Sequence, residues 1–327
     1  MKKLMNSPKT LVADWLDGFS AAHAHIVALA PGRKFLRRAA PAQGKVALIS
    51  GGGSGHEPLH AGFVGRGMLD AACPGPIFTA PTPDQIVEAA NALAGDAGVL
   101  FIVKNYAGDR MNFEMAAEMV RCRHATLLVE DDVVDAETPR AIGRRGVAGT
   151  VIVEKMLGAA AEAGADLEAC LALGEKVKGR TRSIGVALSY CTLPDGRPRY
   201  ATLGPDEMEF GVGIHGEPGR RKAKLVSADA IAEELVSAIL ADLGDRRSED
   251  ALLLINGLGG TPLSELYVMY NSTRRSLERR GVRVVRSLVG NFVTSLDMVG
   301  CSVTVALLDA ELTGLWDSPV HTAALRW

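Results

Sequence analysis

The sequence predicts an α/β protein of two domains, each a largely buried sheet flanked by helices. Short, uninterrupted apolar runs alternate along the chain with segments of helical period, as expected for strands that helices cover on both faces. The length of 327 residues corresponds to about two domains at ~150 residues each. With 47% hydrophobic and 23% charged residues, the composition excludes a disordered, collagen-like or coiled-coil chain.

The elements follow one another in a regular order. Seven apolar runs are predicted strands: 45–50, 98–103, 125–129, 183–188, 251–255, 282–287 and 302–308. Six segments with helical period lie between them: 83–94, 112–121, 149–163, 167–177, 228–243 and 262–280. We expect Thr261 to be the N-cap and Pro262 the first residue of the last helix.

The clearest change of composition lies at residues 190–227, which are rich in glycine, proline and charge and have little helical period. We therefore expect an N-terminal domain, residues 1–185, and a smaller C-terminal domain, residues 186–327. The first would carry a glycine-rich turn with Lys104 and Asp109, and the second would carry the loop of His215.

The charge and the cysteines exclude several classes of function. The chain has 36 Lys and Arg against 38 Asp and Glu, which argues against nucleic-acid binding. No apolar run approaches the ~20 residues of a membrane span, and no signal peptide is seen. Five widely spaced cysteines without a CxxC pair indicate reduced thiols in the cytoplasm and no zinc site. The adjacent acids Asp131 and Asp132 are expected in an exposed turn.

A glycine-rich turn, residues 51–58, directly follows the first predicted strand. Three consecutive glycines predict positive φ angles and exposed backbone N–H groups that would hold an oxyanion or a polyhydroxyl ligand, with His56 at the tip. The GK[ST] of a phosphate-binding P-loop is missing, and the spacing fits a dinucleotide-binding turn poorly. The alternative is a tight turn without a ligand.

Two further loops carry reactive side chains. Lys104 and Asp109 follow the second strand, where open α/β sheets bind ligands; Asp109 is a candidate general base and Lys104 a hydrogen-bond donor. The alternative is that Asp109 caps a helix beginning at Met111. His215, among glycines at 211–219, is a candidate base or nucleophile, or else an ordinary loop histidine. We expect no metal there, because no second ligand has suitable spacing.

Taken together, these motifs resemble the dihydroxyacetone kinase family, in particular its dihydroxyacetone-binding subunit. The resemblance covers nearly the whole chain in one order. It rests on GGGSGHEP (51–58), CPGPIFTAPTPDQI (73–86), KNYAGDRMNFE (104–114), GRRGVAGTV (143–151), EMEFGVGIHGEPG (207–219), NGLGGTPLSELY (256–267), TSLDM (294–298) and LWDSPVHTAALRW (315–327).

The resemblance implies a homodimer of two-domain subunits and a covalently held substrate. His215 would add to the carbonyl carbon of dihydroxyacetone and form a hemiaminal. The hydroxyl groups would be bound by the residues that match the family's site: Gly53, Ser54, Gly55, His56, Lys104 and Asp109. Asp109 would deprotonate the terminal hydroxyl, and His56 would assist as an acid or base.

The phosphoryl donor is expected on another subunit. The sequence has neither a P-loop nor a kinase glycine loop with its partner motifs. The resemblance implies a helical partner subunit that holds ADP or ATP with Mg²⁺, so we expect no cofactor in this chain and activity only with that partner. Because the sequence ends at Trp327, we expect no fused nucleotide domain. A phosphotransferase-system phosphocarrier is favoured over direct use of ATP.

Alternative functions remain open at this point. Residues 32–38 and 79–81 depart from the family's commonest pattern and would suit a longer ketose such as erythrulose. A non-catalytic ketose sensor would keep His215 but would not need Asp109. A nucleotide-dependent dehydrogenase is disfavoured, because the ribose-binding acid is missing.

Overall fold

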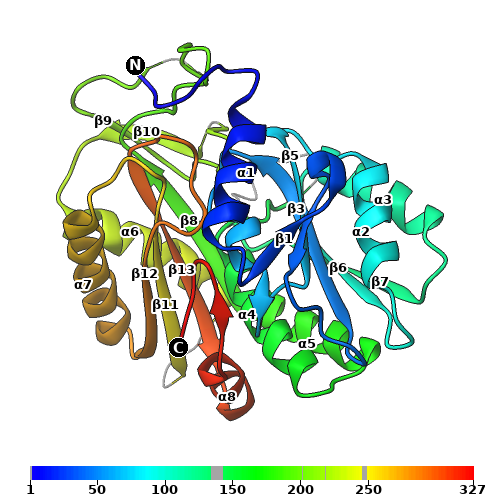
Figure 1. Ribbon diagram of the computed structural model, residues 1–327. Helices are drawn as coiled ribbons and strands as arrows, with labels where there is room; N and C mark the ends of the chain where they lie inside the picture. Colours follow the sequence, from blue (N-terminus) through cyan, green and yellow to red (C-terminus); the bar gives the residue numbers. More distant parts are fainter. Residues whose placement is uncertain (1, 134–142, 201, 218, 245–248) are drawn as a thin grey trace. The chain divides into compact units, whose positions relative to one another are not determined.

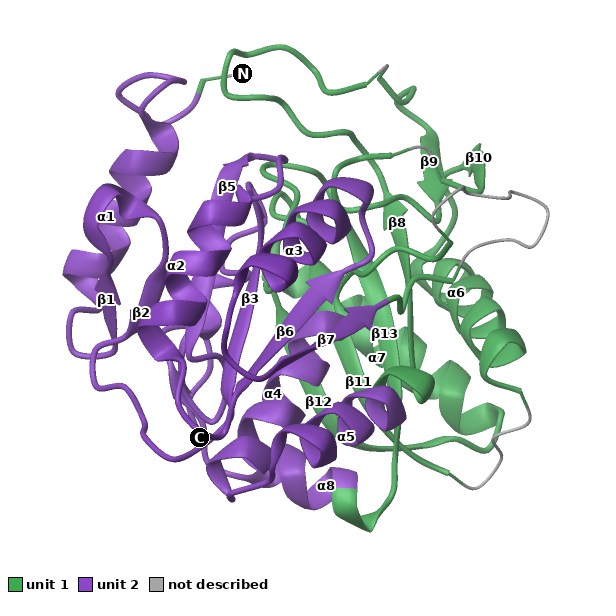
Figure 2. Cartoon of the chain, turned by 90° about the vertical axis from the view of Figure 1, so that its right-hand side faces the viewer, with its two compact units in different colours: residues 1–2, 130–149, 178–311 green, residues 3–129, 150–177, 312–327 purple. Residues whose placement is uncertain are grey.

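The computed structural model describes residues 2–133, 143–200, 202–217, 219–244 and 249–327, which form two compact units (Figure 2). Neither unit is one continuous stretch: unit 1 contains residues 1–2, 130–149 and 178–311, and unit 2 contains residues 3–129, 150–177 and 312–327. The boundary expected between residues 185 and 186 falls inside strand β8 (Thr181–Ala187).

Unit 2 is built on a six-stranded sheet of order β1-β2-β5-β3-β6-β7, which Figure 2 labels in full and Figure 1 labels apart from β2. Its strands are β1 (Val27–Leu29), β2 (Leu36–Arg38), β3 (Ala47–Ser54), β5 (Ala71–Ile77), β6 (Val99–Lys104) and β7 (His124–Val129). The last four in the spatial order run parallel, whereas β1 and β2 add an antiparallel edge. Polar side chains at the ends of β3 and β6 therefore meet at the carboxyl edge of the parallel strands, where α/β sheets place their sites.

Helices flank this sheet. They are α1 (Leu11–Ala22), α2 (Pro83–Leu93), α3 (Ala107–Met119), α4 (Gly149–Glu162), α5 (Leu167–Gly179) and α8 (Ala310–Asp317), of which α4, α5 and α8 begin or end in unit 1. Val99, Phe101 and Val103 alternate along β6 and share one apolar cluster with α2 and α3. Lys104, the next residue, belongs to the other face. A pair of short strands, β4 (Gly65–Arg66) and β14 (His321–Thr322), and two 3₁₀ turns, η1 (Pro31–Arg33) and η2 (Ala61–Phe63), complete the unit.

Unit 1 is a second six-stranded sheet of order β10-β9-β8-β13-β11-β12. Its strands besides β8 are β9 (Glu207–Phe210), β10 (Arg221–Lys224), β11 (Asp250–Gly257), β12 (Arg283–Gly290) and β13 (Gly300–Leu308). Among these six described strands, only β11 and β12 pair in parallel. Helices α6 (Ala228–Leu243) and α7 (Leu263–Arg279) pack on the sheet, and Ile231, Leu235 and Ile239, spaced four apart on α6, enter the shared core.

The predicted α/β class, with sheets flanked by helices, is confirmed. The seven expected strands and six expected helices are all present within a few residues, except that α3 begins at Ala107 rather than Asn112. Strand β5 escaped prediction because Pro74, Gly75 and Pro76 interrupt its apolar pattern. Residues 190–227, whose Ala201 and Pro218 lie outside the described residues, contain the hairpin β9–β10.

Two smaller expectations are wrong. The Thr261 hydroxyl does not cap α7; it donates to the Gly300 carbonyl (2.7 Å) and accepts from the Gly300 N–H (2.8 Å). Pro262, expected as the first helical residue, is the N-cap.

None of the described helices is long and apolar enough to cross a membrane.

Candidate functional site

In unit 2, the predicted residues Lys104 and Asp109 form a buried ion pair. Lys104 ends β6 and is 1% exposed, and Asp109 is 4% exposed. Lys104 Nζ lies 3.3 Å from Asp109 Oδ2, 3.1 Å from the Gly51 carbonyl oxygen and 2.9 Å from His60 Nε2. These three contacts match the three N–H donors of an ammonium group.

The position of Asp109 differs from the alternative interpretation of the sequence. Helix α3 begins at Ala107 with Tyr106 as its N-cap, so Asp109 lies inside the first turn and is not the cap. A carboxylate in the first turn is stabilised by the positive end of the helix dipole. Asp109 therefore lies at the favourable end of the helix, beside the Lys104 ammonium group.

The three glycines of the predicted anion-binding turn lie inside β3 instead. Gly51 to Gly53 pair with Cys73, Pro74 and Gly75 of β5, and none of the three has a positive φ. They are glycine because neighbours approach closely: a Cβ on Gly52 would lie 2.4 Å from Lys104 Nζ, and one on Gly53 would lie 2.5 Å from the Thr79 N. The expectation of a nest of backbone N–H groups formed by these three glycines is wrong.

The turn itself follows at Ser54 to Glu57. Gly55 has a φ of 102°, and its N–H donates to the Glu57 carboxylate at 2.9 and 3.1 Å. Burial raises the pKa of Glu57, although these backbone contacts oppose the shift. The Ser54 hydroxyl donates to the Gly75 carbonyl (2.7 Å). His56 is 1% exposed, and its ring centroid lies 5.0 Å from that of Phe78.

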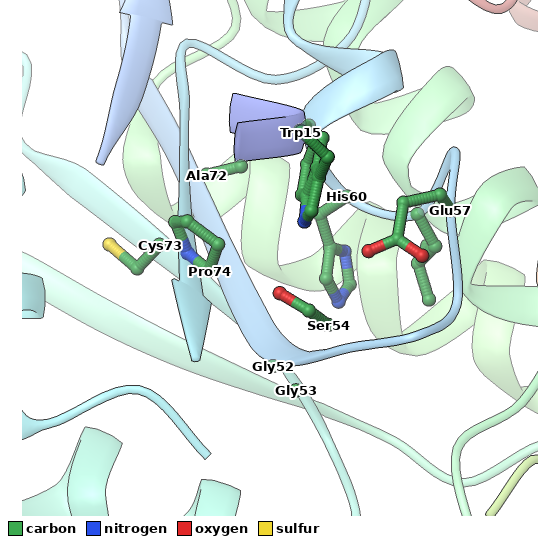
Figure 3. A pocket seen from close by; sticks show the side chains of 11 residues that line it. Trp15, Gly52, Gly53, Ser54, Glu57, His60, Ala72, Cys73 and Pro74 are labelled. Carbon is green, nitrogen blue, oxygen red and sulfur yellow. The ribbon is translucent and has the colours of Figure 1, made fainter. Parts of the chain in front are cut away.

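A small cavity lies beside this turn (Figure 3). Its volume is ≈ 10 Å³, about the space of one water molecule and too little for a triose. Trp15, Glu57 and His60 are among the residues that line it, and Figure 3 shows all three on the same side of the strand that carries Gly52 and Ser54. This cavity is therefore not by itself a substrate site.

In unit 1, His215 is held by Glu217. His215 Nδ1 lies 2.9 Å from Glu217 Oε1, and the His215 backbone N–H donates to Glu217 Oε2 (3.1 Å). Arg145 lies 3.8 Å from the same carboxylate; it also donates to Asp132 (2.6 Å) and to the Gly211 carbonyl (2.7 Å). A carboxylate at Nδ1 places the proton of a neutral imidazole on Nδ1, so that Nε2 carries the lone pair.

Two opposing effects set the pKa of Glu217. Burial raises it, but the hydrogen bond with His215 and the charges of His215 and Arg145 lower it more, to about 2. Glu217 is therefore ionised at neutral pH and stabilises positive charge on the His215 ring.

The adjacent acids Asp131 and Asp132 are buried, not in an exposed turn as expected; each is 1% exposed. Asp132 pairs with Arg145, and Asp131 accepts hydrogen bonds from the backbone N–H groups of Val147 (2.8 Å) and Gly149 (2.7 Å). Burial raises the pKa of Asp131. Both acids thus hold the segment that leads into α4. No group of three or more His, Cys, Asp or Glu among the described residues is arranged to hold a metal ion.

Sequence reasoning missed Glu217, Arg145, His60 and Glu154. Glu217 follows His215 by two residues, a spacing that allows a side-chain contact within one loop. Glu154 interrupts the apolar run of α4 and is fully buried, and a charged residue inside an apolar helix indicates a buried partner. Nothing in the sequence around His60 indicates its role, because its partners Glu154 and Lys104 lie on α4 and β6, far along the chain.

The family model described as "Dak1 domain" matches residues 17–324, so the chain belongs to the Dak1 family. The predicted resemblance to the dihydroxyacetone kinase family is thereby confirmed. The chain is 43% identical to "PEP-dependent dihydroxyacetone kinase, dihydroxyacetone-binding subunit DhaK" of Escherichia coli, covering 100% of this chain and 99% of that protein. It is 46% identical to "PTS-dependent dihydroxyacetone kinase 1, dihydroxyacetone-binding subunit DhaK" of Listeria innocua, over 99% and 100% of the two chains.

Solved structures of related proteins have the same fold as this chain. The dihydroxyacetone kinase of C. freundii superimposes with a TM-score of 0.91 at 35% identity, over 99% of this chain and 60% of that one. A protein described as "Dihydroxyacetone kinase operon co-activator Dha-DhaQ" also gives a TM-score of 0.91, at 34% identity over 95% and 97%.

Proposed function

We propose that this chain is the substrate-binding and catalytic subunit of a dihydroxyacetone kinase, a phosphotransferase that is active only with a nucleotide-bearing partner subunit. Whole-chain identity to two dihydroxyacetone-binding subunits supports the assignment. The observation that carries the chemistry is the contact of His215 Nδ1 with the ionised Glu217.

The covalent step uses this pair. The Nε2 lone pair adds to the carbonyl carbon of dihydroxyacetone, a C–N bond forms, and the carbonyl π electrons move to oxygen. The ring becomes an imidazolium, which Glu217 stabilises at Nδ1. Loss of the Nδ1 proton and protonation of the new alkoxide give a neutral hemiaminal. A triose offers few atoms for non-covalent binding, and this bond recognises the carbonyl that glycerol lacks.

The other predicted site residues would act on the hydroxyl groups of dihydroxyacetone. Asp109 removes the proton of the terminal hydroxyl, His56 assists as acid or base, and Gly53, Ser54, Gly55 and Lys104 complete the binding residues. The hydroxyl oxygen would then accept the γ-phosphoryl group of ATP that a helical partner subunit holds with Mg²⁺, and ADP would be the leaving group. The names of relatives as PTS- or PEP-dependent favour a phosphotransferase-system donor. A homodimer in the cytoplasm belongs to the same proposal.

The test combines intact mass with turnover. Wild-type chain incubated with dihydroxyacetone gains the mass of one substrate molecule, glycerol adds nothing, and His215→Ala abolishes the adduct. Asp109→Asn keeps the adduct but loses about 10²- to 10⁴-fold in phosphorylation when a partner subunit and donor are supplied. A normal adduct in His215→Ala, or turnover by this chain alone with ATP, would contradict the assignment.

A ketose sensor is the second candidate, favoured by the likeness to the protein described as a co-activator. A sensor would form the adduct on His215 but give no phosphorylated product with any partner, and Asp109→Asn would change nothing. Kinases named for D- and L-erythrulose are each 41% identical to this chain, which spans 57% and 56% of their lengths. Competition between erythrulose and dihydroxyacetone for the adduct identifies the preferred ketose.

A further inference from the structure

Four buried polar side chains form a continuous line inside unit 2. Glu154 Oε1 of α4 lies 2.6 Å from His60 Nδ1, His60 Nε2 lies 2.9 Å from Lys104 Nζ, and Lys104 Nζ lies 3.3 Å from Asp109 Oδ2. Each residue is at most 6% exposed. The line therefore connects the proposed base Asp109 to two residues, His60 and Glu154, that the proposed reaction does not use.

The donors and acceptors of this line fix where the protons are. An ammonium group only donates, so His60 Nε2 must accept from Lys104, and the proton of the neutral imidazole is on Nδ1, directed at Glu154. Burial, with the positive charge of Lys104 and the nearby His56, lowers the pKa of His60 well below its usual value. The ring is therefore neutral, as the geometry requires. Burial raises the pKa of Glu154, against the smaller effect of Lys104.

We propose that Glu154 and His60 are positioning residues for the base Asp109: Glu154 holds the Nδ1–H tautomer of His60, and His60 Nε2 orients the Lys104 ammonium toward Asp109. The inference rests on the proposed role of Asp109. The Gly51 carbonyl, His60 and Asp109 together contact the Lys104 ammonium group and so fix its position beside the base.

Matched pairs of variants test the two contacts. His60→Gln keeps an acceptor for Lys104, whereas His60→Leu removes it. Glu154→Gln keeps an acceptor for His60 Nδ1, whereas Glu154→Leu removes it. We expect His60→Leu and Glu154→Leu to lower kcat about 10- to 100-fold, with KM and the His215 adduct unchanged. His60→Gln and Glu154→Gln should recover kcat to within about threefold of wild type.

Thr150→Val is the control on the same helix. Thr150 lies one turn before Glu154 and is fully buried, and its hydroxyl has no hydrogen-bond partner among the described residues. This isosteric change should leave kcat unaltered. If Thr150→Val lowers kcat as much as Glu154→Leu, or if both Gln variants fall with the Leu variants, the positioning role is refuted.

A spectroscopic readout is independent of turnover. With ¹⁵N-labelled histidine, the His60 signals are assigned by their loss in His60→Gln. We expect a neutral Nδ1–H ring at His60 between about pH 6 and pH 8. The titratable groups near the ring are Glu154 of α4, Lys104 of β6, Asp109 of α3, and His56. An imidazolium or an Nε2–H ring in the wild type would overturn the inference. Absence of adduct and turnover in the wild type would instead overturn the proposed function, whatever the His60 spectrum shows.

Discussion

At the scale of single residues, the neighbour of a histidine decides what the histidine can do. His215 and His60 both contact a carboxylate through Nδ1, Glu217 in one case and Glu154 in the other. Glu217 is partly exposed and beside Arg145, and its pKa is lowered to about 2, whereas burial raises the pKa of Glu154. The Nδ1 contact therefore places an ionised carboxylate beside His215, whereas at His60 it holds a neutral ring.

The lowered pKa of Glu217 predicts a pH effect on stability. Its pKa falls from 4.5, the ordinary value, to about 2 on folding, so its contribution is complete above about pH 4.5 and is lost as the pH falls toward 2. We expect wild type to lose about 2 kcal/mol more free energy of unfolding than Glu217→Gln between pH 6 and pH 3. Urea denaturation at both pH values measures it. Equal losses in the two proteins would show that Glu217 is not ionised preferentially in the folded state.

At the scale of elements, the Lys104 side chain at the end of β6 leaves no room for a side chain on Gly52 of the neighbouring strand β3. The carboxyl end of β3 carries Gly51 to Gly53, and the Gly51 carbonyl accepts from Lys104. A side chain on Gly52 would occupy the place of the ammonium. Gly52 is therefore a packing requirement of the Lys104–Asp109 pair.

Gly52→Ala should accordingly harm both stability and turnover. Its Cβ would lie 2.4 Å from Lys104 Nζ, and moving the ammonium breaks contacts in a buried site. We expect a loss of about 1–3 kcal/mol in thermal unfolding together with reduced phosphorylation. The matched control is Gly18→Ala in α1, where a Cβ meets nothing within 4 Å; it should stabilise the protein by up to about 1 kcal/mol. Unchanged turnover in Gly52→Ala would contradict the coupling of the glycine to Lys104.

At the scale of the whole molecule, the chain passes repeatedly between its two compact units. Residues 130–149 belong to unit 1 although residues on both sides of them belong to unit 2, and the C-terminal residues 312–327 return to unit 2. Strand β14 of that C-terminal segment pairs with β4. Each unit therefore needs segments that are distant in sequence.

A cut between residues 185 and 186 should therefore not release two folded domains. It divides β8, which lies between β9 and β13 in the sheet of unit 1. We expect fragments 1–185 and 186–327 expressed separately to lack cooperative thermal unfolding, and co-expression to restore it in part. A sharp unfolding transition in the isolated fragment 186–327 would contradict this expectation.

Much of the fold and part of the site were predictable from sequence, because they depend on local patterns. The period of apolar residues gives the strands and helices, and the reactive side chains His56, Lys104, Asp109 and His215 follow predicted strands or lie among glycines. The short edge strands, and β5 with its prolines, escaped because their pairing partners rather than their own residues make them strands.

The sequence by itself determined the α/β class, the resemblance to one family and the residues that would carry the reaction. Only the tertiary structure decided the environment of each residue. Asp131 and Asp132 are buried, and the glycines at 51–53 lie in a strand. His60 contacts Lys104 on one side of its ring and Glu154 on the other. The physical reason is that burial and hydrogen-bond partners come from residues far apart in the chain. A pattern along the sequence reports periodicity and chemistry, but not which distant group satisfies a buried charge.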